Sequence, residues 1–466
     1  MTARAGRAAA ALLVACAAML PGACTVAGAP PDIVLVVWDT CRGDRVSVNG
    51  YSRPTTPRLA ELAKTGTTFR RCFTPASWTP PAHASLFTGL LPRNHGVRQG
   101  TGGERVSPGI PLLAETLRDA GYETICITAN PMVSTANGLT DGFETVVPIL
   151  RGDDPAGTGQ DALDRVRAWL AGRVAAGERR PFFLFVNLME CHQPYVAEAA
   201  AVAAVRGDAA VNGARRAAET VTMKRTSAHL FEGKPVDAAT IADLDAAYDG
   251  AVRTDDRWTG EILDALGGAG RLGSAFVAVT SDHGESLGEH GELSHLMSVY
   301  EPVLAVPLVL RWPGRFEGGS VEDAEVRLQD LYPTILEAAR VPAPGPCGKD
   351  AVSLIGSPLR PRTLVAEHGP STNALPEARR ALPSASAEVF ERFEFLYRAV
   401  REPASVPGAR KLVQVLRPVP GGAPVVVREE LYDLAADPGE TRNLLGPGAP
   451  AGERAAADRL RAEGGR

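Results

Sequence analysis

Short apolar runs alternate with amphipathic segments along most of the chain. Four runs are largely apolar and too short for ordinary helices, which predicts strands buried on both faces of a sheet; they span residues 33–38, 124–128, 182–188 and 276–280. Helical spacing of apolar positions marks four other segments, residues 57–64, 84–90, 110–120 and 161–175. Strands that alternate with helices indicate an α/β fold whose mostly parallel sheet has helices on both faces.

The pattern changes toward the C-terminus. Proline and glycine are frequent in residues 342–361, and residues 369–387 have the composition of a loop. Three later segments have the length and β-branched content of antiparallel strands, namely residues 394–400, 411–416 and 425–432. We therefore predict a main α/β domain over residues 30–345, a small antiparallel subdomain over 385–446 and a frayed tail over 447–466. An alanine-rich stretch, residues 197–219, predicts a helical insertion on the surface.

The N-terminal segment has the features of an export signal. Two arginines precede an apolar stretch, residues 8–20, and small residues follow it. The stretch is too short for a typical membrane span, so we predict a signal peptide over residues 1–28. Cys24, or Cys16 within the stretch, offers a site for lipid attachment. The protein is expected to be periplasmic, extracellular or anchored to the membrane through an N-terminal lipid.

Charge and cysteine content narrow the function further. The formal net charge of −5 gives no general affinity for nucleic acid, and a polyanionic substrate would need a local basic site. Beyond the predicted signal, five cysteines are scattered singly: Cys41, Cys72, Cys126, Cys191 and Cys347. This spacing is neither a zinc motif nor a dense disulfide framework.

Polar side chains follow three of the predicted strands. Asp39 follows the first, residues 190–192 (Glu-Cys-His) the third, and Asp282 with His283 the fourth. In parallel sheets the chemistry lies beyond the carboxyl ends of the strands. Two carboxylates that meet there repel unless a cation lies between them, and imidazole is a further ligand for divalent metals. The sequence therefore predicts a metal site.

A hydroxyl residue, Thr79, stands before Pro80, Pro81 and a helix. At a helix N-terminus a nucleophile or an anion gains from free N–H groups and the positive end of the dipole. The alternative is that Thr79, or Ser77 before it, only caps the helix.

Many segments, in the same order, resemble the motifs of the sulfatase family, a branch of the alkaline phosphatase superfamily. The matching segments are residues 39–45, 50–57, 79–89, 121–122, 130–131, 141–143, 185–195, 282–285, 300–301, 306–308, 330–334 and 431–444. The resemblance runs from about Asp32 to Leu445. It implies an alkaline-phosphatase-like fold and a metal-dependent hydrolase or transferase that acts on phosphate or sulfate esters.

The nucleophile motif departs from the family pattern. Sulfatases carry a cysteine or serine with proline two residues later and arginine two residues after that, and the first residue becomes formylglycine. Here Thr79, Pro81 and His83 stand at these positions, so formylglycine is not expected. The pattern is similar to threonine-nucleophile phosphotransferases of the same superfamily. That similarity implies one divalent metal, with zinc, manganese, magnesium and calcium as candidates, and a second metal as an open alternative. The implied ligands are Asp39, Thr79, Asp282 and His283.

Three histidines complete the candidate site. His192 and His295 stand where the phosphoethanolamine transferases, which these motifs resemble, have two functional histidines, and His295 follows His283 by twelve residues. They are candidates for substrate binding, leaving-group protonation or a second metal. His83 is a candidate contact for the transferred group in place of the missing arginine. The alternative for His295, and for His290, is a polar loop residue without a catalytic role.

Several functions remain open at this point. A divalent metal lowers the pKa of a hydroxyl that it binds and draws charge from the transferring group, which suits a threonine nucleophile acting on a phosphate ester. The alternatives are a sulfuric ester hydrolase that works without formylglycine, a catalytically inactive binding protein with the same fold, and a structural lipoprotein. Arg42 and Arg53 are expected to be structural, and Lys411 is a further candidate for substrate binding.

Overall fold

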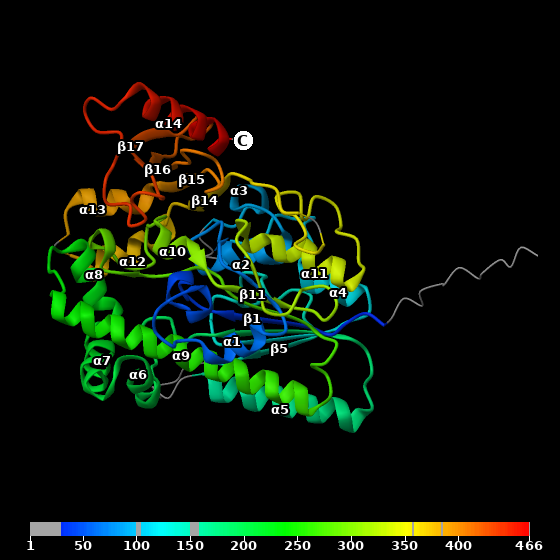
Figure 1. Ribbon diagram of the computed structural model, residues 1–466. Coiled ribbons are helices and arrows are strands. Elements are labelled where there is room, and N and C mark those ends of the chain that lie inside the picture. Colours follow the sequence, from blue (N-terminus) through cyan, green and yellow to red (C-terminus); the bar gives the residue numbers. More distant parts are fainter. Residues whose placement is uncertain (1–28, 99–103, 150–157, 357, 384, 466) are drawn as a thin grey trace, which may run out of the picture.

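The computed structural model describes residues 29–98, 104–149, 158–356, 358–383 and 385–465, and the predicted signal peptide lies outside them. Its centre is an eight-stranded sheet in the order β12-β2-β11-β7-β1-β6-β4-β5. Figure 1 labels β11, β1 and β5 of this sheet. The strands are, in that order, Ser320–Glu322, Thr67–Phe69, Leu308–Arg311, Phe276–Ser281, Ile33–Trp38, Phe182–Leu188, Glu123–Thr128 and Thr145–Pro148. β7, β1, β6, β4 and β5 are parallel, and β11 runs antiparallel to β7 and β2. The predicted mostly parallel α/β fold is therefore confirmed.

Helices cover both faces of this sheet because its central strands are apolar on both faces. Val36 of β1 packs into one core cluster and Val37 into the other. The first face is covered by α1 (Pro57–Ala63), α5 (Gly159–Ala176) and α9 (Ala238–Gly268), and the second by α2 (Thr79–Thr88), α4 (Leu113–Asp119) and α11 (Leu331–Ala339). Full burial of each such aliphatic side chain contributes roughly 1.5–3 kcal/mol.

The longest helix, α9, has no counterpart among the predicted helices. It has 31 residues and begins at the cap of Asp237, whose side chain accepts a hydrogen bond from the Thr240 backbone N–H. Its buried face includes Asp249, Asp255 and Asp256, which interrupt the apolar stripe that helical periodicity requires. The predicted alanine-rich insertion forms α6 (Ala199–Arg206) and α7 (Asp208–Thr220), and both pack on α9.

A second, antiparallel sheet forms the C-terminal subdomain in the order β14-β15-β16-β17. Its strands are Leu364–His368, Leu396–Arg401, Lys411–Arg417 and Val425–Tyr432. The three predicted strands are present, but β14 precedes the predicted start of the subdomain. The prediction of a frayed tail is wrong, because residues there form α14 (Ala451–Gly464). Its Ala456, Ala457 and Leu460 are buried against Val400, Leu412 and Leu431 of the sheet.

The remaining elements are short. They are α3 (Pro92–His95), α8 (Met223–Phe231), α10 (Glu301–Leu304), α12 (Leu375–Ala381), α13 (Ala387–Glu391), β3 (Cys72–Phe73), β8 (Ser286–Leu287), β9 (Leu293–Ser294), β10 (Ala305–Val306) and β13 (Val326–Arg327). No helix in the described part of the chain is long and apolar enough to cross a membrane. The five cysteines named above are free and buried.

Candidate functional site

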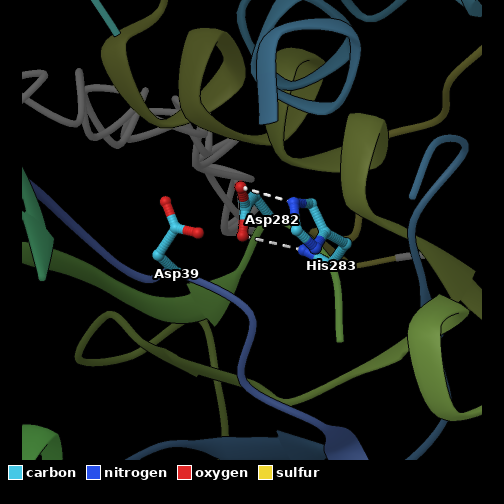
Figure 2. Close-up of side chains that lie close together, drawn as sticks. All are labelled: Asp39, Asp282 and His283. Atoms are coloured by element: carbon cyan, nitrogen blue, oxygen red, sulfur yellow. Dashed lines mark hydrogen bonds and ion pairs between the residues drawn. The ribbon is translucent and has the colours of Figure 1, made fainter. Parts of the chain in front are cut away.

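Two neighbouring strands end at the same level and bring the predicted acidic residues together. β1 and β7 are parallel with Trp38 opposite Ser281, so Asp39 and Asp282, which follow them, reach the same edge of the sheet. Candidate ligand atoms of Asp39, Asp282 and His283 lie within 4.8 Å of one another, and all three residues are buried (Figure 2). This group could hold a metal ion.

The two carboxylates are only partly compensated by the chain. Within the described residues, Asp39 Oδ1 and Asp282 Oδ2 accept no hydrogen bond. Burial raises the pKa of Asp39, and the adjacent Asp282 carboxylate raises that pKa further. Buried like charges cost free energy, which a divalent cation between them would offset. The mixed oxygen and nitrogen donor set fits such a cation and suits zinc, manganese, magnesium and calcium to differing degrees.

Thr79 lies beside this group as the first residue of α2. Its Oγ1 is 3.3 Å from His283 Nε2 and 3.4 Å from Asn130 Nδ2, and the residue is 2% exposed. The residue at the N-cap is Trp78, and it makes no side-chain capping bond. The position of Thr79 Oγ1 is therefore that of a site residue rather than of a helix cap.

Asn130 belongs to the site although the sequence reasoning gave it no role there. Its Nδ2 donates to Asp39 Oδ2 over 2.5 Å, while its Oδ1 accepts from the backbone N–H of Met132 over 2.7 Å. The second bond orients the amide so that its NH₂ faces Asp39 and Thr79. Asn130 follows β4 by two residues, so the strand-end rule applied to Asp39 and Asp282 would also have selected it.

Thr40, the residue after Asp39, contributes both its backbone N–H and its hydroxyl to the site. Its N–H donates to Asp282 Oδ1 over 3.2 Å, and its Oγ1 donates to the Cys191 carbonyl over 2.9 Å. The residue has a φ of 63°, in the left-handed region. Thr40 thus fixes one oxygen of Asp282 and ties the end of β1 to the loop after β6.

His83 lies one turn into α2 and is completely buried. Its Nδ1 is 3.0 Å from the Thr79 carbonyl oxygen and 3.6 Å from Asp282 Oδ2, and its ring packs edge-to-face on Phe87 and Phe185. Burial lowers the pKa of His83 to about 4, so the ring is neutral at neutral pH. Its contact with a transferred group stays a prediction.

His295 packs on both His283 and His192. The His295 ring centroid is 4.6 Å from that of His283 and 5.3 Å from that of His192. His295 Nδ1 lies 3.4 Å from Glu285 Oε1, a buried carboxylate that the sequence reasoning did not single out. Burial places the pKa of His295 well below its usual value, with further lowering by His283. The fold therefore brings together both histidines named from the sequence, and their roles stay predictions.

A third histidine, His368, reaches the site from the C-terminal subdomain. It ends β14, where the Glu367 N–H donates to the Pro75 carbonyl over 2.9 Å. Ser77 Oγ donates to the Ser298 carbonyl over 2.6 Å, so His368 Nδ1, 3.1 Å away, donates to Ser77 Oγ. The Trp78 ring lies between those of His295 and His368, with centroids 5.1 and 6.2 Å away.

Four other candidates lie outside this cluster. Arg42 is buried and pairs with Asp44 and Glu289, Arg53 lies 3.9 Å from Asp249, and His290 stacks on Tyr300 with ring centroids 3.7 Å apart. Lys411 is fully buried and pairs with Glu301 and Glu440 at 3.0 and 2.7 Å. The contacts of these side chains are structural, as expected for the two arginines.

Comparison with known proteins agrees with this geometry. The family model described as Sulfatase matches residues 31–341. The chain is 26% identical to the multifunctional alkaline phosphatase superfamily protein PehA of Trinickia caryophylli, with 66% of this chain and 73% of that protein covered. It is also 26% identical to arylsulfatase A of Bos taurus, with 90% and 84% covered.

Among solved structures, the fold is similar to that of the phosphonate monoester hydrolase from Silicibacter pomeroyi. The TM-score is 0.70 at 21% identity, and 93% of this chain and 94% of that chain are covered. The family match spans more than half of the chain and includes the buried aspartates, the histidine beside them and the threonine at the start of α2. The chain therefore belongs to the sulfatase family of hydrolases, within the alkaline phosphatase superfamily.

Proposed function

We propose that this protein is a metal-dependent enzyme that cleaves phosphate esters with Thr79 as its nucleophile. One observation carries the proposal: Thr79 Oγ1 lies within 3.4 Å of both His283 and Asn130, beside the group that could hold a metal. Asp39, Asp282, His283 and Thr79 would hold a divalent ion. When bound, such an ion supplies Lewis-acid chemistry, which lowers the pKa of a hydroxyl and draws charge from the transferring group.

The chain's own groups would orient the nucleophile. Asn130 Nδ2 and His283 Nε2 lie on two sides of Thr79 Oγ1, which restricts its rotation. The first three residues of α2 are Thr79, Pro80 and Pro81. Because proline has no backbone N–H, only Thr79 among these three carries one. Donors to the transferred group must then come mainly from side chains, and Asn130 is the best placed of these.

Proton transfer to the leaving group is assigned to His192. Its Nδ1 lies 2.7 Å from the Gln193 carbonyl oxygen, which fixes Nδ1–H and leaves Nε2 to exchange protons. The ring is partly exposed, whereas that of His295 is buried against Glu285 and Trp78. His295 would hold the substrate or a second metal.

A sulfate ester is the second candidate substrate. It is favoured by the similarity to arylsulfatase A over 90% of the chain. A threonine at the nucleophile position favours phosphate, because formylglycine cannot form from it. Transfer to an acceptor hydroxyl in place of water would use the same first step. An inactive binding protein is disfavoured because the candidate ligands are all present.

The test is turnover by purified protein of para-nitrophenyl phosphate, its bis ester and para-nitrophenyl sulfate with each candidate metal. We expect phosphate monoester turnover to fall by about 10⁴-fold or more in Thr79→Ala, as for other nucleophile deletions. Thr79→Ser should retain part of it. Thr88→Ala is the matched control, since Thr88 lies on the same helix and its Oγ1 donates to the Ala84 carbonyl. Turnover of the sulfate alone would overturn the preference for phosphate, and full activity in Thr79→Ala would overturn the nucleophile.

Export is a separate part of the proposal. Two arginines followed by a short apolar stretch support a signal peptide over residues 1–28. Cell fractionation of the full chain and of its Cys24→Ala and Cys16→Ala variants distinguishes the routes. Lipid anchoring predicts that one variant moves from the membrane to the soluble exported fraction, and recovery of the full chain in the cytosol would contradict export.

A further inference from the structure

A hollow of ≈ 370 Å³ opens at the carboxyl ends of β4 and β5, at the edge of the main sheet. This volume is in the range of sites that bind small molecules. Its apolar walls are Pro131, Val133, Val146, Pro148 and Ile149, and Asn130 is among its uncharged polar residues.

Asn130 joins this hollow to the proposed reaction centre. The residue lines the hollow, and its Nδ2 is 2.5 Å from Asp39 Oδ2 and 3.4 Å from Thr79 Oγ1. Its backbone N–H donates to Asn187 Oδ1 over 3.1 Å, and its Oδ1 accepts from the Met132 N–H. Because these bonds fix Asn130, the hollow has a defined position relative to the nucleophile.

The residues that line the hollow disfavour a charged ligand. None of the described residues that line the hollow is acidic or basic. Arg105 reaches the same loop, but it donates to the Thr135 carbonyl and forms an ion pair with Asp141. A sulfated or phosphorylated glycan would lose hydration here without gaining a partner, whereas an uncharged apolar group would gain from burial.

We propose that the hollow binds the uncharged, apolar alcohol portion of the ester, such as an aryl group, while the charged group faces Thr79. This inference rests on the proposed function and names the substrate class within it. In the first step a bond from phosphorus to Thr79 Oγ1 forms as the bond from phosphorus to the alcohol oxygen breaks. Thr79 Oγ1 gives its proton to solvent, and the departing alcohol oxygen takes a proton from His192. A water oxygen then bonds to phosphorus as His192 takes one of its protons. The bond from phosphorus to Thr79 Oγ1 breaks, phosphate is released, and Oγ1 regains a proton from solvent.

The test fills the hollow and compares two leaving groups. Ser134→Trp places a large ring on the lining, and Ala136→Trp places the same ring on the same loop outside the lining. The substrates are para-nitrophenyl phosphate and acetyl phosphate, whose leaving group is too small to fill the hollow. Binding of free para-nitrophenol, by calorimetry with and without metal, gives a readout that needs no turnover.

We expect Ser134→Trp to lower para-nitrophenol affinity and the kcat/KM for the aryl ester by about tenfold or more, a typical effect of a changed apolar pocket. The kcat/KM for acetyl phosphate should stay within about twofold, and Ala136→Trp should change none of these values. Unchanged para-nitrophenol affinity in Ser134→Trp, or its displacement by a disulfated disaccharide, would overturn the inference. Absence of all ester turnover together with Ser134-dependent para-nitrophenol binding would instead overturn the proposed function.

Discussion

Two of the buried charge clusters among the described residues are balanced in different ways. At the junction with the C-terminal sheet, Lys411 is fully buried and pairs with Glu301 at 3.0 Å and with Glu440 at 2.7 Å. At the carboxyl edge of the main sheet, Asp39 and Asp282 lie together, and one oxygen of each accepts no hydrogen bond from the described residues.

The contrast separates structural charge from functional charge. A buried ion pair supplies its own counter-charge, so it holds the subdomain to the main domain without any ligand. Asp39 and Asp282 repel each other when both are ionised, and a cation from outside would offset that repulsion. Burial and charge are common to both clusters, and the sign of the neighbours distinguishes them.

The largest effect should come from breaking the balanced cluster. Lys411→Met leaves the buried Glu440 without the cation that pairs with it, whereas Glu301 keeps Arg401 at 3.9 Å. We therefore expect the free energy of unfolding to fall by about 3–5 kcal/mol. Urea denaturation measures this change. Lys234→Met removes an exposed partner of Glu232 and should cost less than about 1 kcal/mol. Equal costs for the two variants would show that Lys411 is not a structural cation.

Asp39→Asn should have the opposite effect on stability. In protein stripped of metal, removing one of two like charges should raise the free energy of unfolding, because the two carboxylates repel when no cation lies between them. Metal affinity should fall by more than about 100-fold, beyond the loss typical of outer-shell partners. Calorimetric metal titration and urea denaturation after chelation check the two parts. Asp264→Asn, which removes an exposed partner of Arg58, serves as the control. A less stable metal-free Asp39→Asn protein would contradict the repulsion.

Asn130→Ala tests the amide that lies between the carboxylates and the nucleophile. We expect kcat to fall by about 10–100-fold, as for residues that orient metal ligands. The free energy of unfolding should fall by about 1–3 kcal/mol, the cost of leaving the buried partners of the Asn130 side chain without a hydrogen bond. Steady-state kinetics and urea denaturation on the same samples separate the two effects. A loss of stability with kcat unchanged would make Asn130 purely structural.

Some of these residues and elements could be predicted from the sequence and others could not, for physical reasons. Asp39, Asp282 and His283 follow strands that were recognisable from their apolar runs, so their meeting at one sheet edge was predictable. Asn130 follows a predicted strand in the same way and was accessible to that rule. The buried aspartates of α9 hid this helix from the sequence reasoning, because their hydrogen-bond partners lie on other segments that meet α9 only in the folded chain.

The place of His368 in the site could not be predicted from any local sequence pattern. Its strand belongs to a separate sheet, and its contact with Ser77 joins residues 291 positions apart. α14 illustrates a related limit, because its small buried alanines carry little periodic signal until a sheet is present for them to cover. Contacts between the two sheets are set by tertiary packing, which hydrophobic periodicity does not encode.

The smallest effect that we predict concerns the link between the two regions, and His95 offers a matched control for it. His368 and His95 are both buried imidazoles beside a serine, at 3.1 Å from Ser77 Oγ and 2.9 Å from Ser85 Oγ. Burial lowers the pKa of each to about 3, so both are neutral. Substitution of either histidine by glutamine should therefore lower the free energy of unfolding by about 1–2 kcal/mol, the cost of losing a buried hydrogen bond.

Of these two histidines, only His368 lies next to the Trp78 ring, which also packs on His295. A shift of Ser77 in His368→Gln would move Trp78 and the adjoining Thr79, and small displacements of a reacting group lower the rate because the attack geometry is lost. We expect kcat to fall by about tenfold in His368→Gln and to stay unchanged in His95→Gln. Steady-state kinetics and urea denaturation of both variants check this. Equal losses of kcat in the two variants would mean that lowered stability, and not the position of Trp78, limits the rate. The C-terminal sheet would then have no part in the reaction centre.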